Sequence, residues 1–347
     1  MNPYALSILL SSLAIGTVTT FISNHWFLAW IGLELNTLAI LPLITKMHHP
    51  RATEAATKYF LIQASASALI LFSMTLNSWL TGHWMIMNTI HDIPSMILTI
   101  ALTMKLGVAP FHMWLPDEKQ GSNLFTCLIL STWQKLAPMI LLFQTSSQLN
   151  IHVLMMMAIM STMIGGWGGL NQTQVRKIMA YSSIAHLGWM ILVLTFLPNL
   201  MLLNLFIYLL MTSSMFMMLM TLSSTNMNKM ALSWLKSPTL VSTMLIMLMS
   251  LGGLPPTSGF MPKWLILQEI TKHNMNVMAT IMAMSALLSL FFYLRMSYCI
   301  SLTTAPNTSN SNIMWRLNTR PYFMMSMLII LATMLLPMTT MLNNWTI

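Results

Sequence analysis

Long apolar stretches, separated by short polar connections, run along almost the whole chain. About 20 apolar residues in a helix cross the hydrocarbon core of a bilayer, and eleven segments of this kind are present. The strict alternation that marks barrel strands is absent, so a helix bundle is the structure that can satisfy its backbone inside a membrane. We predict an all-α, polytopic bundle with spans near residues 3–23, 25–45, 52–80, 93–116, 122–145, 150–170, 174–196, 199–224, 238–271, 275–303 and 322–343.

Basic residues gather in alternate connections of this predicted bundle. The connections after the even-numbered spans contain nine Lys and Arg residues, whereas those after the odd-numbered spans contain only Lys272. Connections rich in Lys and Arg stay on the side from which the helices insert. The N-terminus is therefore expected on the basic side and the C-terminus opposite. The nine residues are Lys46, Arg51, Lys119, Arg176, Lys177, Lys229, Lys236, Arg316 and Arg320.

Glycine and proline interrupt two of the predicted spans in the same way. The fourth span carries Leu106-Gly107-Val108-Ala109-Pro110 and the ninth carries Leu251-Gly252-Gly253-Leu254-Pro255, so both share Leu-Gly-x-x-Pro, 145 residues apart. Proline removes a backbone donor and clashes with the preceding turn, which predicts that both helices are discontinuous there. Five connections separate the two spans, so they run in opposite directions, as in the inverted repeats of secondary transporters. The alternative is a coincidence of two proline-containing helices.

Composition excludes a soluble fold. Of the 347 residues, 56% are hydrophobic and 6% are charged, with a mean hydropathy of +0.72; soluble domains carry about 25% charged residues. The net charge of +9 comes from Lys and Arg placed singly between apolar runs, without the basic stripe of a nucleic-acid-binding protein. We expect a single membrane domain over residues 1–347 and no nucleic-acid partner.

Methionine is unusually frequent, with 40 residues spread over every apolar segment. Vertebrate mitochondria read an isoleucine-type codon as methionine, so a chain made inside that organelle would show this bias. A Met-rich substrate groove is the alternative, but the even spread of the methionines favours the codon explanation.

Four charged residues are expected inside the membrane: Glu34, Lys105 and Lys135 near the middle of their spans, and Lys263 after the break in the ninth span. Each costs about 2.5–3.5 kcal/mol at mid-bilayer, so we predict that they face the bundle interior at similar depth. Desolvation disfavours the ammonium, which makes a buried lysine suited to carrying protons. The alternative is a structural bridge between Glu34 and one lysine.

Two histidines are further candidates for a proton relay, His112 in the fourth span and His186 in the seventh, because imidazole titrates near neutral pH. Structural hydrogen bonding is the alternative for both. Glu54 and Lys58 lie one helical turn apart and predict a surface ion pair. The sequence contains no dinucleotide fingerprint, iron–sulfur cysteine cluster or nucleophile constellation, so we expect no cofactor or metal bound by this chain.

The chain resembles the antiporter-like membrane subunits of respiratory complex I, the proton-pumping NADH–ubiquinone oxidoreductase. The resemblance covers the whole chain and is most specific in Leu106–Asp117, Tyr181–Gly188 and Gly252–Lys263. The family is similar to subunits of multi-subunit sodium/proton antiporters and usually has fourteen helices, of which this chain lacks about three at its N-terminus. It implies two inverted five-helix repeats, over residues 1–145 and 146–303, followed by a linker and a C-terminal helix in 304–347.

The resemblance also implies roles. Glu34 and Lys105 match the family's glutamate–lysine pair, Lys135 its relay lysine and Lys263 its exit-side lysine. NADH, FMN, iron–sulfur clusters and ubiquinone would bind other subunits, and the expected partners are neighbouring antiporter-like subunits and membrane lipids. The basic side would be the matrix side of the mitochondrial inner membrane, with the C-terminus in the intermembrane space. The alternatives are a component of a cation/proton antiporter and a purely structural membrane-arm subunit.

Overall fold

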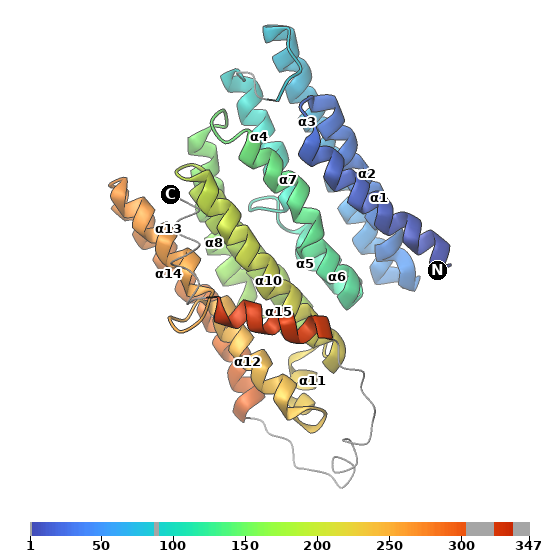
Figure 1. The fold of residues 1–347 in the computed structure, drawn as a ribbon, viewed down its shortest axis with the longest axis vertical. Helices are drawn as coiled ribbons and strands as arrows, with labels where there is room; N and C mark the ends of the chain where they lie inside the picture. Colours follow the sequence, from blue (N-terminus) through green and yellow to red (C-terminus); the bar gives the residue numbers. More distant parts are fainter. Residues whose placement is uncertain (1, 87–89, 303–322, 336–347) are drawn as a thin grey trace. The chain divides into compact units, whose positions relative to one another are not determined.

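The computed structural model describes residues 2–86, 90–302 and 323–335, and these residues are almost entirely helical, as predicted (Figure 1). Two short 3-10 helices, Thr45–Met47 and Leu232–Leu235, accompany the α-helices. The α-helices are α1 (Pro3–Ile22), α2 (Trp26–Ile44), α3 (Pro50–Thr81), α4 (Asp92–Leu106), α5 (Trp114–Gly121), α6 (Leu124–Ser131), α7 (Trp133–Gln144), α8 (Ile151–Gly169), α9 (Val175–Leu194), α10 (Pro198–Leu222), α11 (Met227–Ala231), α12 (Pro238–Gly252), α13 (Phe260–Lys272), α14 (Asn276–Leu302) and α15 (Phe323–Met334).

Eight stretches of the described chain are long and apolar enough to cross a membrane. They are α1, α2, α3, the α6–α7 stretch Leu124–Gln144, α8, α9, α10 and α14. Two of the remaining predicted spans are the interrupted ones. The last, predicted over 322–343, is described only as far as residue 335, and Arg316 and Arg320 lie outside the described residues.

Both interrupted spans break as predicted, and each first half ends in the same backbone cap. α4 stops at Gly107 and α12 at Gly253, two glycines in the left-handed conformation with φ of 74° and 80°. The residue after each glycine donates its backbone N–H to the helix, to Thr103 and Met249 respectively, as in a Schellman cap. The second halves, α5 and α13, each begin seven residues after the glycine. The structural repeat is therefore 146 residues, one more than the shared Leu-Gly-x-x-Pro suggested.

The chain forms two compact units, Met1–Ser161 with Met190–Pro198, and Thr162–Trp189 with Asn199–Ile347. The first contains the broken pair α4/α5 and the second contains α12/α13. The finer division into two five-helix repeats at residue 145 stays a prediction.

In the first unit, α1, α2 and α3 lie side by side (Figure 1). α1 and α2 approach closely because Gly16 and Gly32 face each other: a Cβ on Gly16 would lie 2.9 Å from the Gly32 carbonyl oxygen, and one on Gly32 2.8 Å from the Gly16 carbonyl oxygen. Small residues permit such backbone contact in membranes. α7 is held beside them by hydrogen bonds from Trp133 to the Leu13 carbonyl and from Gln134 to the Asn36 carbonyl.

Replacing Gly107 with alanine is expected to destabilise the assembled protein more than replacing Gly82. Both glycines have φ near 75°, so each substitution costs about 1–2 kcal/mol of backbone strain. At Gly82 a Cβ meets nothing within 4 Å, whereas at Gly107 it would overlap Leu115 and lie 2.9 Å from the Trp114 ring, adding about 1–3 kcal/mol. Thermal denaturation of the assembled complex measures the difference, and equal losses from the two variants would contradict this packing.

Candidate functional site

Lys105 lies in the last turn of α4, where the helix stops inside the bundle. Its backbone carbonyl would be left without a partner by the break, and Gln63 of α3 donates its side-chain amide to it at 3.1 Å. The ammonium nitrogen is buried and makes no hydrogen bond within the described part of the chain. A cation is favoured at this position because the C-terminal end of a helix carries partial negative charge.

Glu34 on α2 supplies the nearest carboxylate. Its Oε2 lies 4.0 Å from the Nζ of Lys105, and the Glu34 side chain is 25% exposed while that of Lys105 is 2% exposed. The Thr37 hydroxyl, one turn further along α2, donates to the Glu34 backbone carbonyl at 2.8 Å and lies 3.4 Å from Oε2. The separation of 4.0 Å is a loose ion pair, without the direct hydrogen bond that would lock both charges.

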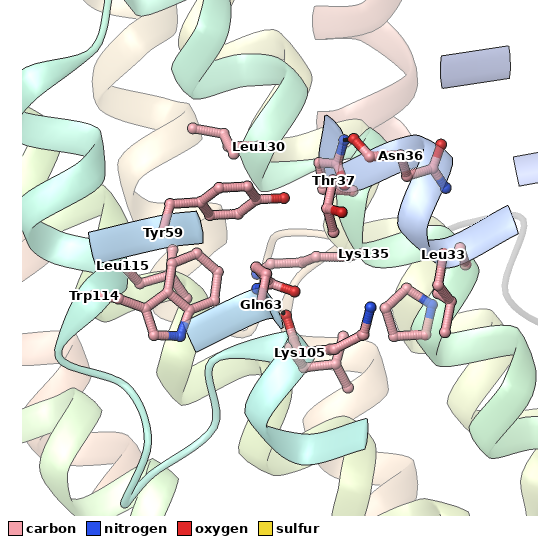
Figure 2. Close-up of a pocket in the computed structure, with 14 residues that line it drawn as sticks. Leu33, Asn36, Thr37, Tyr59, Gln63, Lys105, Trp114, Leu115, Leu130 and Lys135 are labelled. Carbon is pink, nitrogen blue, oxygen red and sulfur yellow. Dashed lines mark hydrogen bonds between the residues drawn. The ribbon is translucent and has the colours of Figure 1, made fainter. Parts of the chain in front are cut away.

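Lys135, in the first turn of α7, is buried and faces the same small chamber as Lys105. Figure 2 shows the side chains of Lys105, Lys135 and Gln63 in this space, with the Tyr59 hydroxyl directed toward Thr37. The chamber volume is about 20 Å³, enough for one water molecule. Its lining comes from α2, α3, α4, α5, α6 and α7: Leu33, Asn36, Thr37, Tyr59, Gln63, Lys105, Leu106, Trp114, Leu115, Leu130, Gln134, Lys135, Ala137 and Pro138.

Lys263 belongs to the second unit, in the first turn of α13. Its Nζ donates a hydrogen bond of 2.9 Å to the carbonyl oxygen of Gly252. Gly252 is the last residue of α12. The lysine therefore satisfies a carbonyl that the break in the helix frees, and the helix end in turn favours its positive charge.

The two candidate histidines are both buried, in different units. His112 lies in the break between α4 and α5, with its Nδ1 3.2 Å from the Pro110 carbonyl oxygen, as structural hydrogen bonding would require. His186 on α9 packs its ring 5.5 Å from that of Tyr208 on α10. A relay role for either stays a prediction. Among the described residues, no group of three His, Cys, Asp or Glu side chains is placed to hold a metal ion.

Two buried charges, Glu118 and Lys119, were not recognised from the sequence. The run Asp117-Glu118-Lys119 resembles a polar connection, and Lys119 was expected there as an exposed topology signal. The structure corrects this: the three residues lie on α5, and both Glu118 and Lys119 are 0% exposed. The signal available in the sequence was their position directly after the interrupted span, where the chain has not yet left the protein interior.

On the other side of α5, a polar cavity of about 150 Å³ is lined by Arg51, Glu54, Ala55, Lys58, Asp117, Gln120 and Gly121. The predicted Glu54–Lys58 ion pair is present at 2.6 Å, and Asp117 extends it with an oxygen 2.9 Å from the Lys58 nitrogen. We call this space the outer cavity, because all three of these charged side chains are more than 40% exposed.

Comparison with known proteins agrees with the membrane helix bundle. Residues 23–289 match the family described as NADH:quinone oxidoreductase/Mrp antiporter, TM, and residues 290–343 match the NADH dehydrogenase subunit 2 C-terminus. The chain belongs to this family of NADH:quinone oxidoreductase and Mrp antiporter membrane subunits.

The curated relatives with high identity share one name within this family. NADH-ubiquinone oxidoreductase chain 2 of Salmo salar is 57% identical over 98% of this chain and 97% of its own length. The protein of the same name from Xenopus laevis is 55% identical over 97% of this chain and 98% of its own.

Solved structures share the fold. A chain of respiratory complex I from Thermus thermophilus, determined with bound aureothin, aligns with a TM-score of 0.83 at 25% identity, covering 97% of this chain and 79% of that one. A chain of the Mrp complex from Dietzia sp. aligns with a TM-score of 0.79 at 16% identity over 86% of this chain and 61% of that one, which shows the fold alone.

Replacing Glu34 with glutamine is expected to lower proton translocation by the assembled complex about tenfold, a modest effect for a proton-transferring group. The change keeps the side-chain volume and removes the carboxylate 4.0 Å from Lys105. Glu269→Gln is the matched control, because Glu269 is similarly exposed but pairs with the surface residue Lys272. Proton uptake by reconstituted vesicles measures both variants; equal translocation by the two would contradict a role for the Glu34–Lys105 pair.

Proposed function

We propose that this chain is a membrane-arm subunit of proton-translocating NADH:ubiquinone oxidoreductase, in the mitochondrial inner membrane, and that its buried Glu and Lys residues carry the protons. The observation that supports this most directly is the chamber of the first unit, where Lys105 and Lys135 share a space the size of one water molecule. The relatives named above, at more than 50% identity over nearly the full length, support membership of the chain in a respiratory complex.

The arrangement suits proton movement more than fixed charge pairing. A structural ion pair inside a protein needs close geometry and additional hydrogen bonds to offset desolvation. Here the Glu34–Lys105 separation is 4.0 Å and the Lys105 ammonium makes no hydrogen bond among the described residues. We therefore infer that small changes in neighbouring charge alter the pair, so that Lys105 passes a proton to Lys135 through the chamber. Lys263, at the other broken helix, is the proposed exit-side residue.

The energy for these steps comes from redox chemistry elsewhere in the complex. The complex carries NADH, FMN, iron–sulfur clusters and ubiquinone, and we propose that none of them binds this chain. Neighbouring antiporter-like subunits would transmit the energy through the membrane. Lipids would cover the exposed apolar side chains of the helices, such as Ile8, Phe72, Trp79, Phe206 and Phe291.

Two alternatives make different predictions. A component of a cation/proton antiporter would share the Mrp fold, but that likeness rests on 16% identity. Copurification of this chain with a flavin–iron–sulfur complex would identify a respiratory subunit, whereas an antiporter component would purify without one. A purely structural subunit would tolerate neutralisation of its buried charges without loss of pumping.

Lys135→Met tests the relay directly. Methionine keeps the stem volume and removes the titrating amine, so the complex is expected to assemble. Proton translocation per NADH oxidised, or turnover where coupling is tight, should fall about tenfold or more, as expected for loss of a proton-transferring group. Lys272→Met is the control, because Lys272 is 58% exposed and pairs only with Glu269 among the described residues. Unchanged pumping in an assembled Lys135→Met complex would favour the structural alternative.

We also predict that the N-terminus faces the matrix and the C-terminus the intermembrane space. Without the buried Lys119, eight basic residues in the even-numbered connections against one in the others still give this orientation. Protease treatment of mitochondria stripped of their outer membrane should remove a tag from the C-terminus and leave an N-terminal tag intact. Cleavage of both tags, or protection of both, would show that the predicted number of spans is wrong.

A further inference from the structure

α5 separates two polar spaces of the first unit and presents a different face to each. Trp114 and Leu115 line the inner chamber with Lys105 and Lys135, whereas Asp117, Gln120 and Gly121 line the outer cavity. Residues three and four positions apart share a side of a helix. Glu118 follows Trp114 by four positions and Leu115 by three, so it lies next to these two residues on the helix surface, and it lines neither space itself.

Glu118 is unusual among the acidic residues of the chain. It is 0% exposed, and neither carboxyl oxygen has a hydrogen-bond partner among the described residues. Burying a carboxylate without a hydrogen bond is costly, so such a group is neutralised by a proton or by a nearby opposite charge, and the buried neighbour Lys119 is the one cation that interacts with Glu118 among the described residues. A merely structural glutamate at this position would be expected to bond a backbone amide or a neighbouring side chain.

The groups around Glu118 connect it to the chamber. Tyr59, which lines the chamber and packs its ring 5.5 Å from that of Trp114, interacts electrostatically with both Glu118 and Glu34. Lys119 interacts with Glu118 and repels Lys135. A change in the protonation of Glu118 therefore acts on Tyr59 in the chamber lining and on Lys119, which in turn acts on Lys135.

We propose that Glu118 is a proton-carrying residue, through which protons pass across α5 from the outer cavity to the lysines of the inner chamber. A proton from water in the outer cavity binds a carboxylate oxygen of Glu118. The O–H bond then breaks as an N–H bond forms on a chamber lysine in its neutral form, through water or the Tyr59 hydroxyl. The carboxylate left behind accepts the next proton, so the residue is regenerated in each cycle. This inference rests on the proposed proton translocation by this chain.

The test compares Glu118→Gln, Glu118→Asp and Glu269→Gln in the assembled complex reconstituted into vesicles, with Lys135→Met measured alongside. Glu118→Gln should reduce NADH-driven proton uptake about tenfold, Glu118→Asp should restore part of it, and Glu269→Gln should match the unchanged protein. Normal uptake in Glu118→Gln while Lys135→Met is impaired overturns this inference alone. Normal uptake in both variants means that the proposed function itself has failed.

If Glu118→Gln does not assemble, a second measurement tests whether Glu118 changes its protonation during turnover. Infrared difference spectra, recorded on addition of NADH, should show a carboxyl C=O band that appears or disappears as the complex turns over. That band should shift in Glu118→Asp, because the aspartic acid retains a carboxyl group in an altered environment. Identical bands in the unchanged protein and in Glu118→Asp would overturn the proposal.

Discussion

A helix that stops inside an apolar bundle leaves carbonyl groups that lipid cannot satisfy, and this constraint shapes the polar interior of the protein. At the end of α4 the Gln63 amide bonds the Lys105 carbonyl, and at the end of α12 the Lys263 ammonium bonds the Gly252 carbonyl. Both hydrogen bonds place a polar side chain inside the bundle, where burying a polar group without a partner costs free energy. The breaks therefore explain why lysines are tolerated there, since each lies beside the partially negative end of a helix.

The same constraint produces the chamber. Because α4 ends at Gly107, the chain must turn before α5 begins at Trp114, and α5 then packs against α3. This brings the ring of Trp114 against Tyr59 and closes a water-sized space around Lys105 and Lys135. The separation of inner chamber and outer cavity by a single short helix follows from the interruption of one span.

Much of this was predictable from the sequence. Apolar runs of membrane length predicted the helices, because a backbone in lipid must satisfy its own hydrogen bonds and a helix does so. Glycine and proline within two of these runs predicted both breaks. The cost of unmatched charge in a membrane indicated that Glu34 would pair with one of the lysines, and the family resemblance identified that lysine as Lys105. The shared Leu-Gly-x-x-Pro is offset by one residue from the structural repeat, since two adjacent glycines follow Leu251 and only backbone geometry shows that Gly253 is the cap. Glu118 and Lys119 were missed because a hydrophilic run normally indicates exposure, whereas here tertiary packing buries it.

The two breaks share a backbone design while sharing few side chains. Each has a left-handed glycine, a proline three positions later and a new helix seven positions later, yet Lys105 precedes its break and Lys263 follows its own. The geometry of the interruption is thus fixed by glycine and proline rather than by the buried lysines. The position of a lysine relative to such a break can therefore change without rebuilding the fold, so the two interruptions can differ in chemistry while sharing one backbone geometry.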